Sequence, residues 1–102
     1  MRHQDTAEDH EGYYALRLYI AGNNQNSVLA LRNIRRICEE HLAGCYELEV
    51  IDIYQQPELV LSENLVAIPT LIKKLPPPFQ RIIGDLSNTE KVLVGLNIHP
   101  SL

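Results

Sequence analysis

The stretch from residue 14 to residue 54 carries three consecutive hydrophobic patterns that restrict how the chain can fold. Apolar residues alternate with other residues over 14–20 and again from 46 onwards, which is typical of strands. Between these stretches they recur at three- and four-residue steps, which predicts a helix with one apolar stripe: Val28, Leu31, Ile34, Cys38 and Leu42. Connections this short require a right-handed crossover and parallel strands. We therefore predict an α/β fold whose first half is a strand–helix–strand unit.

Local signals mark the ends of these elements. Gly22 interrupts the first strand, and either Asn26 or Ser27 can cap the helix, because a short side-chain oxygen accepts a free N–H of the first turn. Gly44 provides the stop at the other end of the helix. The second strand then begins near Tyr46, and its later part is more apolar, so we expect that part to be more deeply buried.

The hinge between the first strand and the helix is the place where thioredoxins carry a cysteine pair. A dithiol oxidoreductase needs a thiolate there, because the positive end of the helix dipole lowers the thiol pKa. Positions 23–27 read Asn-Asn-Gln-Asn-Ser instead. The sequence therefore excludes thiol–disulfide exchange, and since no other convincing catalytic group is present, we expect a protein that is not an enzyme.

The two cysteines, Cys38 and Cys45, are too few for a disulfide framework, and both are predicted to be small buried hydrophobic residues. Together with His41 they form a compact trio that suggests a zinc site. A structural zinc site needs four ligands, however, and no fourth lies nearby except in the N-terminal segment. We therefore expect neither a metal nor a cofactor.

Charge and length limit the partners and the location. The formal net charge is -4 over 102 residues, and residues 1–12 carry -3 of it (one arginine against four acids), so the body is nearly neutral. A nearly neutral body is a poor ligand for nucleic acid. The apolar runs are too short to span a membrane, so we expect a cytoplasmic protein. We predict an acidic disordered tail over 1–12, a single domain over 13–102, and a homo-oligomer, dimer or tetramer, because so short a chain buries limited surface.

The second half of the chain gives weaker signals. A short helix is predicted over 57–64, a third strand over 67–72 and a short strand with a turn over 80–85, with a proline run between the last two. Residues 87–90 read Ser-Asn-Thr-Glu, a capping box that predicts a helix through about Leu96. Against this, Val92-Leu93-Val94 and Asn97-Ile98 favour a strand, and Gly95 weakens a helix by about 1 kcal/mol. The two assignments stay open.

Several strings taken together carry a resemblance to a known family. They are Leu18-Tyr19-Ile20-Ala21-Gly22-Asn23, Asn26-Ser27-Val28, Val50-Ile51-Asp52, Pro69-Thr70-Leu71, Leu75-Pro76-Pro77-Pro78, Ile82-Ile83-Gly84-Asp85-Leu86-Ser87 and Glu90-Lys91-Val92-Leu93. From about residue 14 to 96 the chain resembles the KaiB family of bacterial clock proteins, which belongs to the thioredoxin-like superfamily. The triple proline followed by the Ile-Ile-Gly-Asp-Leu-Ser string is the most specific part.

The resemblance implies a regulator that binds a KaiC-type ring ATPase and modulates its activity or output. It also implies two arrangements of the second half, a tetrameric ground state and a thioredoxin-like monomer that docks on the ATPase. The implied partner-binding residues are Glu49, Ile51, Glu58, Asn64 and Arg81. The implied switch residues are Pro69, Pro76, Pro77, Pro78, Gly84, Asp85, Gly95 and Asn97. Slow isomerisation of X-Pro bonds would give the prolines a part in the switch, whereas the alternative is that they shape a rigid loop.

Some positions depart from the family pattern. Clock-type members usually place basic residues where this chain has Leu29, Glu49, Asn64 and Gln80. The resemblance therefore leaves an alternative: an adaptor or sensor-like module for a different partner, such as a histidine kinase or a KaiA-type protein, in a stress response outside a true oscillator.

Overall fold

The first half of the chain forms two parallel strands joined by one long helix. The computed structural model describes residues 12–98, so the predicted tail lies outside the described residues apart from Gly12, as do positions 99–102 of the predicted domain. The three elements of this half are β1 (Tyr14–Ile20), α2 (Gln25–His41) and β2 (Tyr46–Asp52). Residues of β1 and β2 pair in parallel throughout, with Leu18 opposite Val50. The predicted strand–helix–strand unit is confirmed.

The second half adds two antiparallel strands and two short helices. Its elements are α3 (Glu58–Ser62), β3 (Thr70–Leu75), β4 (Gln80–Ile83) and α4 (Thr89–Gly95). Strand β3 runs antiparallel to β1 and β4 antiparallel to β3, which gives one sheet in the order β2-β1-β3-β4. The last segment is a helix here, so this structure has the thioredoxin-like arrangement of the second half. We use that term for it below.

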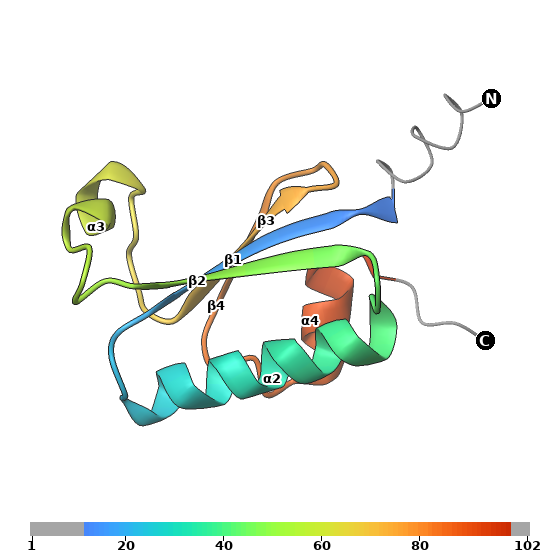
Figure 1. Ribbon diagram of the computed structural model, residues 1–102, viewed down its shortest axis with the longest axis horizontal. Helices are drawn as coiled ribbons and strands as arrows, with labels where there is room; N and C mark the ends of the chain where they lie inside the picture. The colour runs from blue at the N-terminus through green and yellow to red at the C-terminus, as the bar shows by residue number, and fades with distance from the viewer. Residues whose placement is uncertain (1–11, 99–102) are drawn as a thin grey trace.

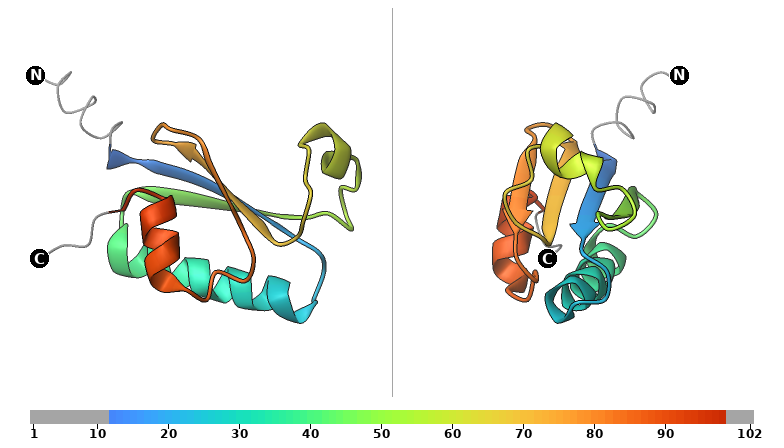
Figure 2. Two further views of the ribbon diagram at one scale, coloured as in Figure 1. Left: turned by 180° about the vertical axis from the view of Figure 1, so that it is seen from behind. Right: turned by 90° about the vertical axis from the view of Figure 1, so that its left-hand side faces the viewer.

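The sheet separates two unequal layers of helix. Helices α2 and α4 lie together on one side of it, and α3 lies on the other side near one end of the sheet (Figures 1 and 2). The main core fills the space between the sheet and the pair α2 and α4. A smaller apolar cluster lies beneath α3: Tyr19, Ile51, Leu65 and Ile72, with Ile53, Leu59 and Ile68 around it. Because α3 is short, it covers only part of its face.

The buried stripe of α2 differs from the predicted one. Val28 is 42% exposed and Leu31 is half-buried, whereas the residues that face the core are Ser27, Ala30, Ile34, Ile37, Cys38 and Leu42. A helical period permits two neighbouring stripes in this sequence. The prediction followed the one with larger side chains and passed over Ser27 and Ala30, which are small enough to bring the helix close to the sheet.

Both helix caps were assigned one or more residues away from their true positions. Asn24, rather than Asn26 or Ser27, caps α2, and its Oδ1 accepts the N–H of Ser27 at 2.8 Å. The Ser27 hydroxyl is buried and accepts the N–H of Ala21 at 3.0 Å. Asn88, rather than Ser87, caps α4 by accepting the N–H of Lys91 at 3.1 Å. In each case asparagine provides the oxygen, since it ranks with serine among N-cap residues.

Candidate functional site

The turn between β1 and α2 is a structural junction without redox chemistry. Gly22 has φ of +60°, and its N–H donates to Asp52 Oδ1 at 3.0 Å. The same carboxylate oxygen accepts the N–H of Tyr54 at 3.0 Å. The Tyr54 ring lies so close that a Cβ at position 22 would be 2.9 Å from it. Asp52 and Tyr54 therefore hold the turn against the end of β2, and a side chain at position 22 would have to displace the Tyr54 ring and adopt a strained φ.

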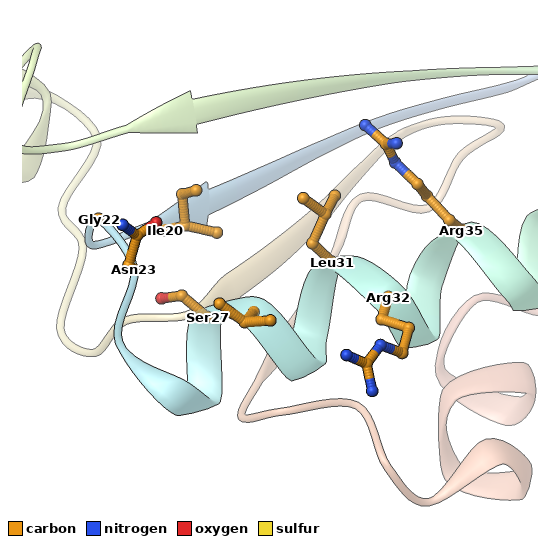
Figure 3. A pocket seen from close by; sticks show the side chains of 8 residues that line it. Ile20, Gly22, Asn23, Ser27, Leu31, Arg32 and Arg35 are labelled. Atoms are coloured by element: carbon orange, nitrogen blue, oxygen red, sulfur yellow. The ribbon is translucent and has the colours of Figure 1, made fainter.

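A pocket of about 420 Å³ opens beside this turn, between α2 and the end of β1 (Figure 3). Its apolar wall comes from Ile20, Val28 and Leu31, and Arg32 and Arg35 of α2 also line it, pointing to opposite sides of the helix (Figure 3). It contains no thiol, carboxylate or imidazole among its lining residues. The one hydroxyl among these residues, that of Ser27, is buried and accepts the N–H of Ala21, so no base in the lining activates it.

Neither cysteine is placed for reactivity. Cys38 is fully buried, and its burial raises the pKa of the thiol to about 12, so the thiol stays protonated at neutral pH. Cys45 is half-buried rather than buried as predicted, and its Sγ donates to the carbonyl of Leu42 at 3.3 Å. Across residues 12–98 no three His, Cys, Asp or Glu side chains gather as metal ligands would. Over the same residues no helix is long and apolar enough to cross a membrane.

The face of the sheet on the α3 side carries the candidate partner-binding surface. Strand register places four residues in one row across this face: Glu49 on β2, Arg17 on β1, Ile72 on β3 and Arg81 on β4. Arg17 Nε lies 2.9 Å from Glu49 Oε1, and Arg17 Nη1 donates to the hydroxyl of Tyr19 at 3.1 Å. Two hydrogen bonds raise the pKa of the Arg17 guanidinium: the bond to Tyr19 contributes more, and the bond to Glu49 contributes less. This part of the sheet is therefore polar and ordered.

Four of the five predicted partner-binding residues expose their side chains around this face. Glu49 and Arg81 belong to the row described above, Glu58 begins α3, and Asn64 follows α3 with φ of +58°. Arg81 Nη1 donates to the carbonyl of Asn64 at 3.2 Å, which ties the segment after α3 to the edge strand β4. The fifth residue, Ile51, is buried beneath α3 with 6% of its surface exposed. In this fold it supports the surface from below.

Sequence reasoning missed a set of exposed apolar side chains on the same side. Leu61 on α3 is 86% exposed, Val66 after it 82%, and Tyr54 before it 72%. Phe79 and Ile83 at β4 are also exposed, and the guanidinium of Arg81 lies 5.8 Å from the centre of the Phe79 ring. Exposed apolar residues rimmed by polar ones are typical of binding surfaces. Leu61 and Val66 lie on either side of the exposed Asn64 in the sequence. Their closeness to this predicted partner-binding residue could have identified them.

The predicted switch residues lie mainly in the connections of the second half. Pro69 precedes β3, and its carbonyl accepts the N–H of Gly84 at 3.0 Å. Pro76, Pro77 and Pro78 form the connection between β3 and β4, and the peptide bonds before Pro69, Pro76 and Pro78 are cis. Nothing in this arrangement tests their part in a switch, which stays a prediction.

The other switch residues shape the approach to α4 and its end. Gly84 has φ of +118°, and Asp85 Oδ1 accepts the N–H of Ser87 at 3.0 Å in the turn that follows. A Cβ on Gly95 would come within 2.8 Å of Ile82 Cδ1, so the glycine allows α4 to lie close to β4. Asn97 has φ of +58° and lies one residue beyond the C-cap.

The hydrogen bonds around Asn97 form a Schellman motif. The N–H of Asn97 donates to Val94 at 3.1 Å, and the N–H of Ile98 donates to Leu93 at 2.9 Å. Asparagine is one of the few side chains that adopts such a left-handed backbone without large strain.

Among the departures from the family pattern, Leu29 on α2 and Gln80 at the start of β4 are half-buried, and neither contributes to the row on the α3 side.

Comparisons with known proteins agree on both the family and the fold. A model of the KaiB domain matches residues 17–98. The circadian clock protein KaiB3 of Synechocystis sp. is 58% identical over 85 residues, covering 83% of each chain, and the circadian clock oscillator protein KaiB of Thermostichus vulcanus is 53% identical, covering 83% of this chain and 79% of that one.

Among solved structures, the N-terminal domain of Synechococcus elongatus SasA superposes with a TM-score of 0.67 at 24% identity, covering 88% of this chain and 89% of that domain. Chloroplastic thioredoxin z gives a TM-score of 0.67 at 17% identity, covering 93% and 88%. At these identities the structural neighbours establish a thioredoxin-like fold and nothing more. The predicted fold class and the predicted family are both confirmed: this chain is a member of the KaiB family.

Proposed function

We propose that this protein is a regulator of a bacterial clock or signalling system that acts by binding a KaiC-type ring ATPase. Relatives named as circadian clock proteins, at 58% and 53% identity over most of the chain, support the clock role. The absence of a reactive thiol or a metal-binding cluster from residues 12–98 agrees with action through binding. The protein then changes the activity or output of the ATPase without chemistry of its own.

The α3 side of the sheet is the proposed docking surface. The observation that carries this assignment is the position of Glu49, Glu58, Asn64 and Arg81 around one face together with the exposed apolar residues Leu61 and Val66. Apolar anchors surrounded by polar and charged groups are the usual anatomy of a protein interface. The bond from Arg81 to Asn64 fixes the segment that carries Val66, which reduces the entropy lost on binding.

Two further parts of the proposal concern the state of the protein. We place one domain over 13–102, with 1–12 as an appended acidic segment, and we expect a free homo-oligomer that differs from the thioredoxin-like arrangement in its second half. If the thioredoxin-like arrangement is the form that binds, its fraction in the free protein sets the apparent affinity. A histidine kinase or a KaiA-type protein would share the same surface.

Size-exclusion chromatography with light scattering tests the docking surface. The protein is measured alone and after hours of incubation with the KaiC-type ATPase of the same genome. Leu61→Asp is expected to abolish a complex of one protomer per ATPase subunit, because it places a charge in the proposed contact. Val28→Asp is the control, since Val28 is an exposed apolar residue of α2, on the opposite side of the sheet.

The outcomes separate the alternatives. Loss of the complex with Leu61→Asp alone supports the surface. Equal binding by both variants contradicts it, and loss with Val28→Asp alone moves the interface to the α2 side. If the unmodified protein forms no complex with the ATPase, the adaptor role for another partner replaces the proposal.

A further inference from the structure

Lys73 is a charged residue in an unusual place. Its side chain is fully buried, at 0% relative exposure, although lysine is rarely buried because its ammonium loses strong hydration. Strand β3 presents it toward the helix pair α2 and α4, opposite Leu16 of β1. The adjacent Lys74 is exposed. The same strand therefore carries one lysine in the core and one in water.

The buried amine is poorly compensated. Its Nζ donates to the carbonyl of Leu96 at 3.4 Å, which is a long hydrogen bond, and lies 5.9 Å from the centre of the Tyr14 ring. Within residues 12–98 no carboxylate lies within 4 Å of it. Tyr14 is the titratable group that faces it, and burial raises the pKa of that phenol, so it remains neutral. An ammonium has three donors, and this site serves them incompletely.

The contacts of Lys73 depend on α4. Leu96 is the C-cap of α4, and the hydroxyl of Tyr14 donates to the next carbonyl, that of Asn97, at 3.0 Å. Docking of α4 therefore closes the site over the amine and removes it from water. Burial lowers the pKa of Lys73, as expected when the charged form loses more hydration than the site returns.

We propose that Lys73 weakens the docking of α4 and so keeps the thioredoxin-like arrangement close in free energy to an alternative arrangement of the second half. When α4 leaves, the amine regains its hydration, so the buried charge favours departure. This inference rests on the proposed function in one respect: the switch between two arrangements is what the weak docking serves. The residue itself makes no contact with a partner.

Urea unfolding of the wild-type protein, Lys73→Met and Lys74→Met tests the sign of the effect. It is measured at a dilution where light scattering finds monomers, so that the thioredoxin-like arrangement unfolds and not the proposed oligomer. Methionine keeps the length and apolar body of the side chain and removes the charge. At pH 7 we expect Lys73→Met to have the higher urea midpoint and a several-fold larger ratio of folded to unfolded protein, whereas Lys74→Met matches the wild type. An equal or lower midpoint for Lys73→Met, compared with Lys74→Met, would overturn the proposal.

The pH dependence provides a second signature. Because the pKa of Lys73 is lowered on folding, the unfolded chain binds more protons between the folded and unfolded pKa values, and stability contributed by this group rises with pH. The advantage of Lys73→Met over Lys74→Met should therefore shrink as the pH approaches 10. A constant advantage would show that methionine acts through packing and not by removing a charge.

An NMR titration of the lysine side chains needs no variant and covers the case in which Lys73→Met fails to fold. We expect the pKa of Lys73 to lie below the ordinary value for lysine, and titration at that ordinary value would contradict the proposal. None of these measurements includes the ATPase, so their failure is distinct from failure of the docking surface. If the docking surface and the effect of Lys73 on α4 are both supported, Lys73→Met should bind the ATPase faster than Lys74→Met does. Equal binding rates would show that Lys73 has no part in the switch.

Discussion

The two halves of this molecule reach their structures in different ways. From Tyr14 to Asp52 the chain forms two strands of seven residues and a helix of 17. The two strands pair with each other without a register shift. From Glu58 to Gly95 the elements have five, six, four and seven residues. Among residues 12–98, the left-handed residues other than glycine all lie after α3: Asn64, Leu86 and Asn97. Long periodic elements distribute stability over many contacts, whereas short ones depend on a few residues in special conformations.

The largest difference between the halves should appear in core truncations. Leu18 in β1 and Leu96 after α4 are both fully buried. Leu18→Ala is expected to lower the free energy of global unfolding by about 2–5 kcal/mol, because it leaves a cavity in the main core. Leu96→Ala is expected to release residues 89–98 first. Amide hydrogen exchange distinguishes the two, since β1 and β2 should stay protected only in Leu96→Ala.

A smaller effect should isolate the backbone at the end of α4. Asn97 has an exposed side chain, so substitutions there act mainly through its φ of +58°. Asn97→Val should destabilise the thioredoxin-like arrangement by about 1–2 kcal/mol, since a β-branched residue is strained in this region. Asn97→Gly is the matched control and should be neutral or slightly stabilising. Exchange rates of the α4 amides provide the measurement, and equal rates in both variants would remove the role assigned to this turn.

Two equivalent caps provide a direct comparison of the halves. Asn24→Ala and Asn88→Ala each remove one side-chain bond to a first-turn N–H, worth about 1 kcal/mol. The loss at Asn24 should appear in the urea midpoint of the whole protein. The loss at Asn88 should appear mainly as faster exchange within α4. If both variants lower the midpoint equally, the two halves unfold together and the comparison fails.

Alkaline pH should weaken the first half slightly through Cys38. Burial raises the pKa of its thiol to about 12, so the stability from the buried neutral thiol is complete below the unfolded pKa and is lost as pH rises toward 12. The expected loss is about 0.5 kcal/mol by pH 9. Cys38→Ala should lack this slope in urea unfolding at pH 7, 8 and 9. A slope that persists in the variant belongs to other groups.

The smallest effect on stability is expected at Glu49. Its carboxylate lies 2.9 Å from Arg17 but is 56% exposed, and exposed ion pairs contribute about 0–1 kcal/mol. Glu49→Gln should therefore leave the urea midpoint nearly unchanged. Glu49→Lys, which restores the basic character expected of clock-type relatives, should alter ATPase binding more than stability. A large stability loss in Glu49→Gln would mean that the row on the α3 side holds the sheet together.

The sequence predicted the three elements of the first half because hydrophobic period reports directly on β1, α2 and β2, although it misassigned the N-cap and part of the buried stripe of α2. The second half was predicted as short segments with an open choice at residues 87–98, where strand-favouring Val92–Val94 compete with a cap. A tertiary contact and a local stop decide that choice: Gly95 lies close to the Ile82 side chain of β4, and Asn97 ends the helix through bonds to Val94 and Leu93. Local propensity does not contain the contact with Ile82, and the prediction did not use the left-handed preference of Asn97.

The candidate site was predicted in part. Glu49, Glu58, Asn64 and Arg81 came from the resemblance, and strand register explains why Glu49 and Arg81 share a face although they are far apart in sequence. Leu61, Val66 and Lys73 were missed for opposite reasons. Leu61 lies in a helix of five residues, too short to show an apolar stripe, and Val66 lies in the connection after it, whereas Lys73 is a charged residue inside a buried strand, so composition alone misplaces all three.

The order of the strands also affects how this protein behaves at high concentration. Strands β2 and β4 are the outer members of the sheet, so each offers backbone groups to which another chain can add a strand. Along β2 the exposed side chains are Glu47 and Glu49, and like charges facing each other across two such edges repel. These glutamates therefore favour solubility. Replacing both by apolar residues would allow the β2 edges of two molecules to pair and would promote aggregation.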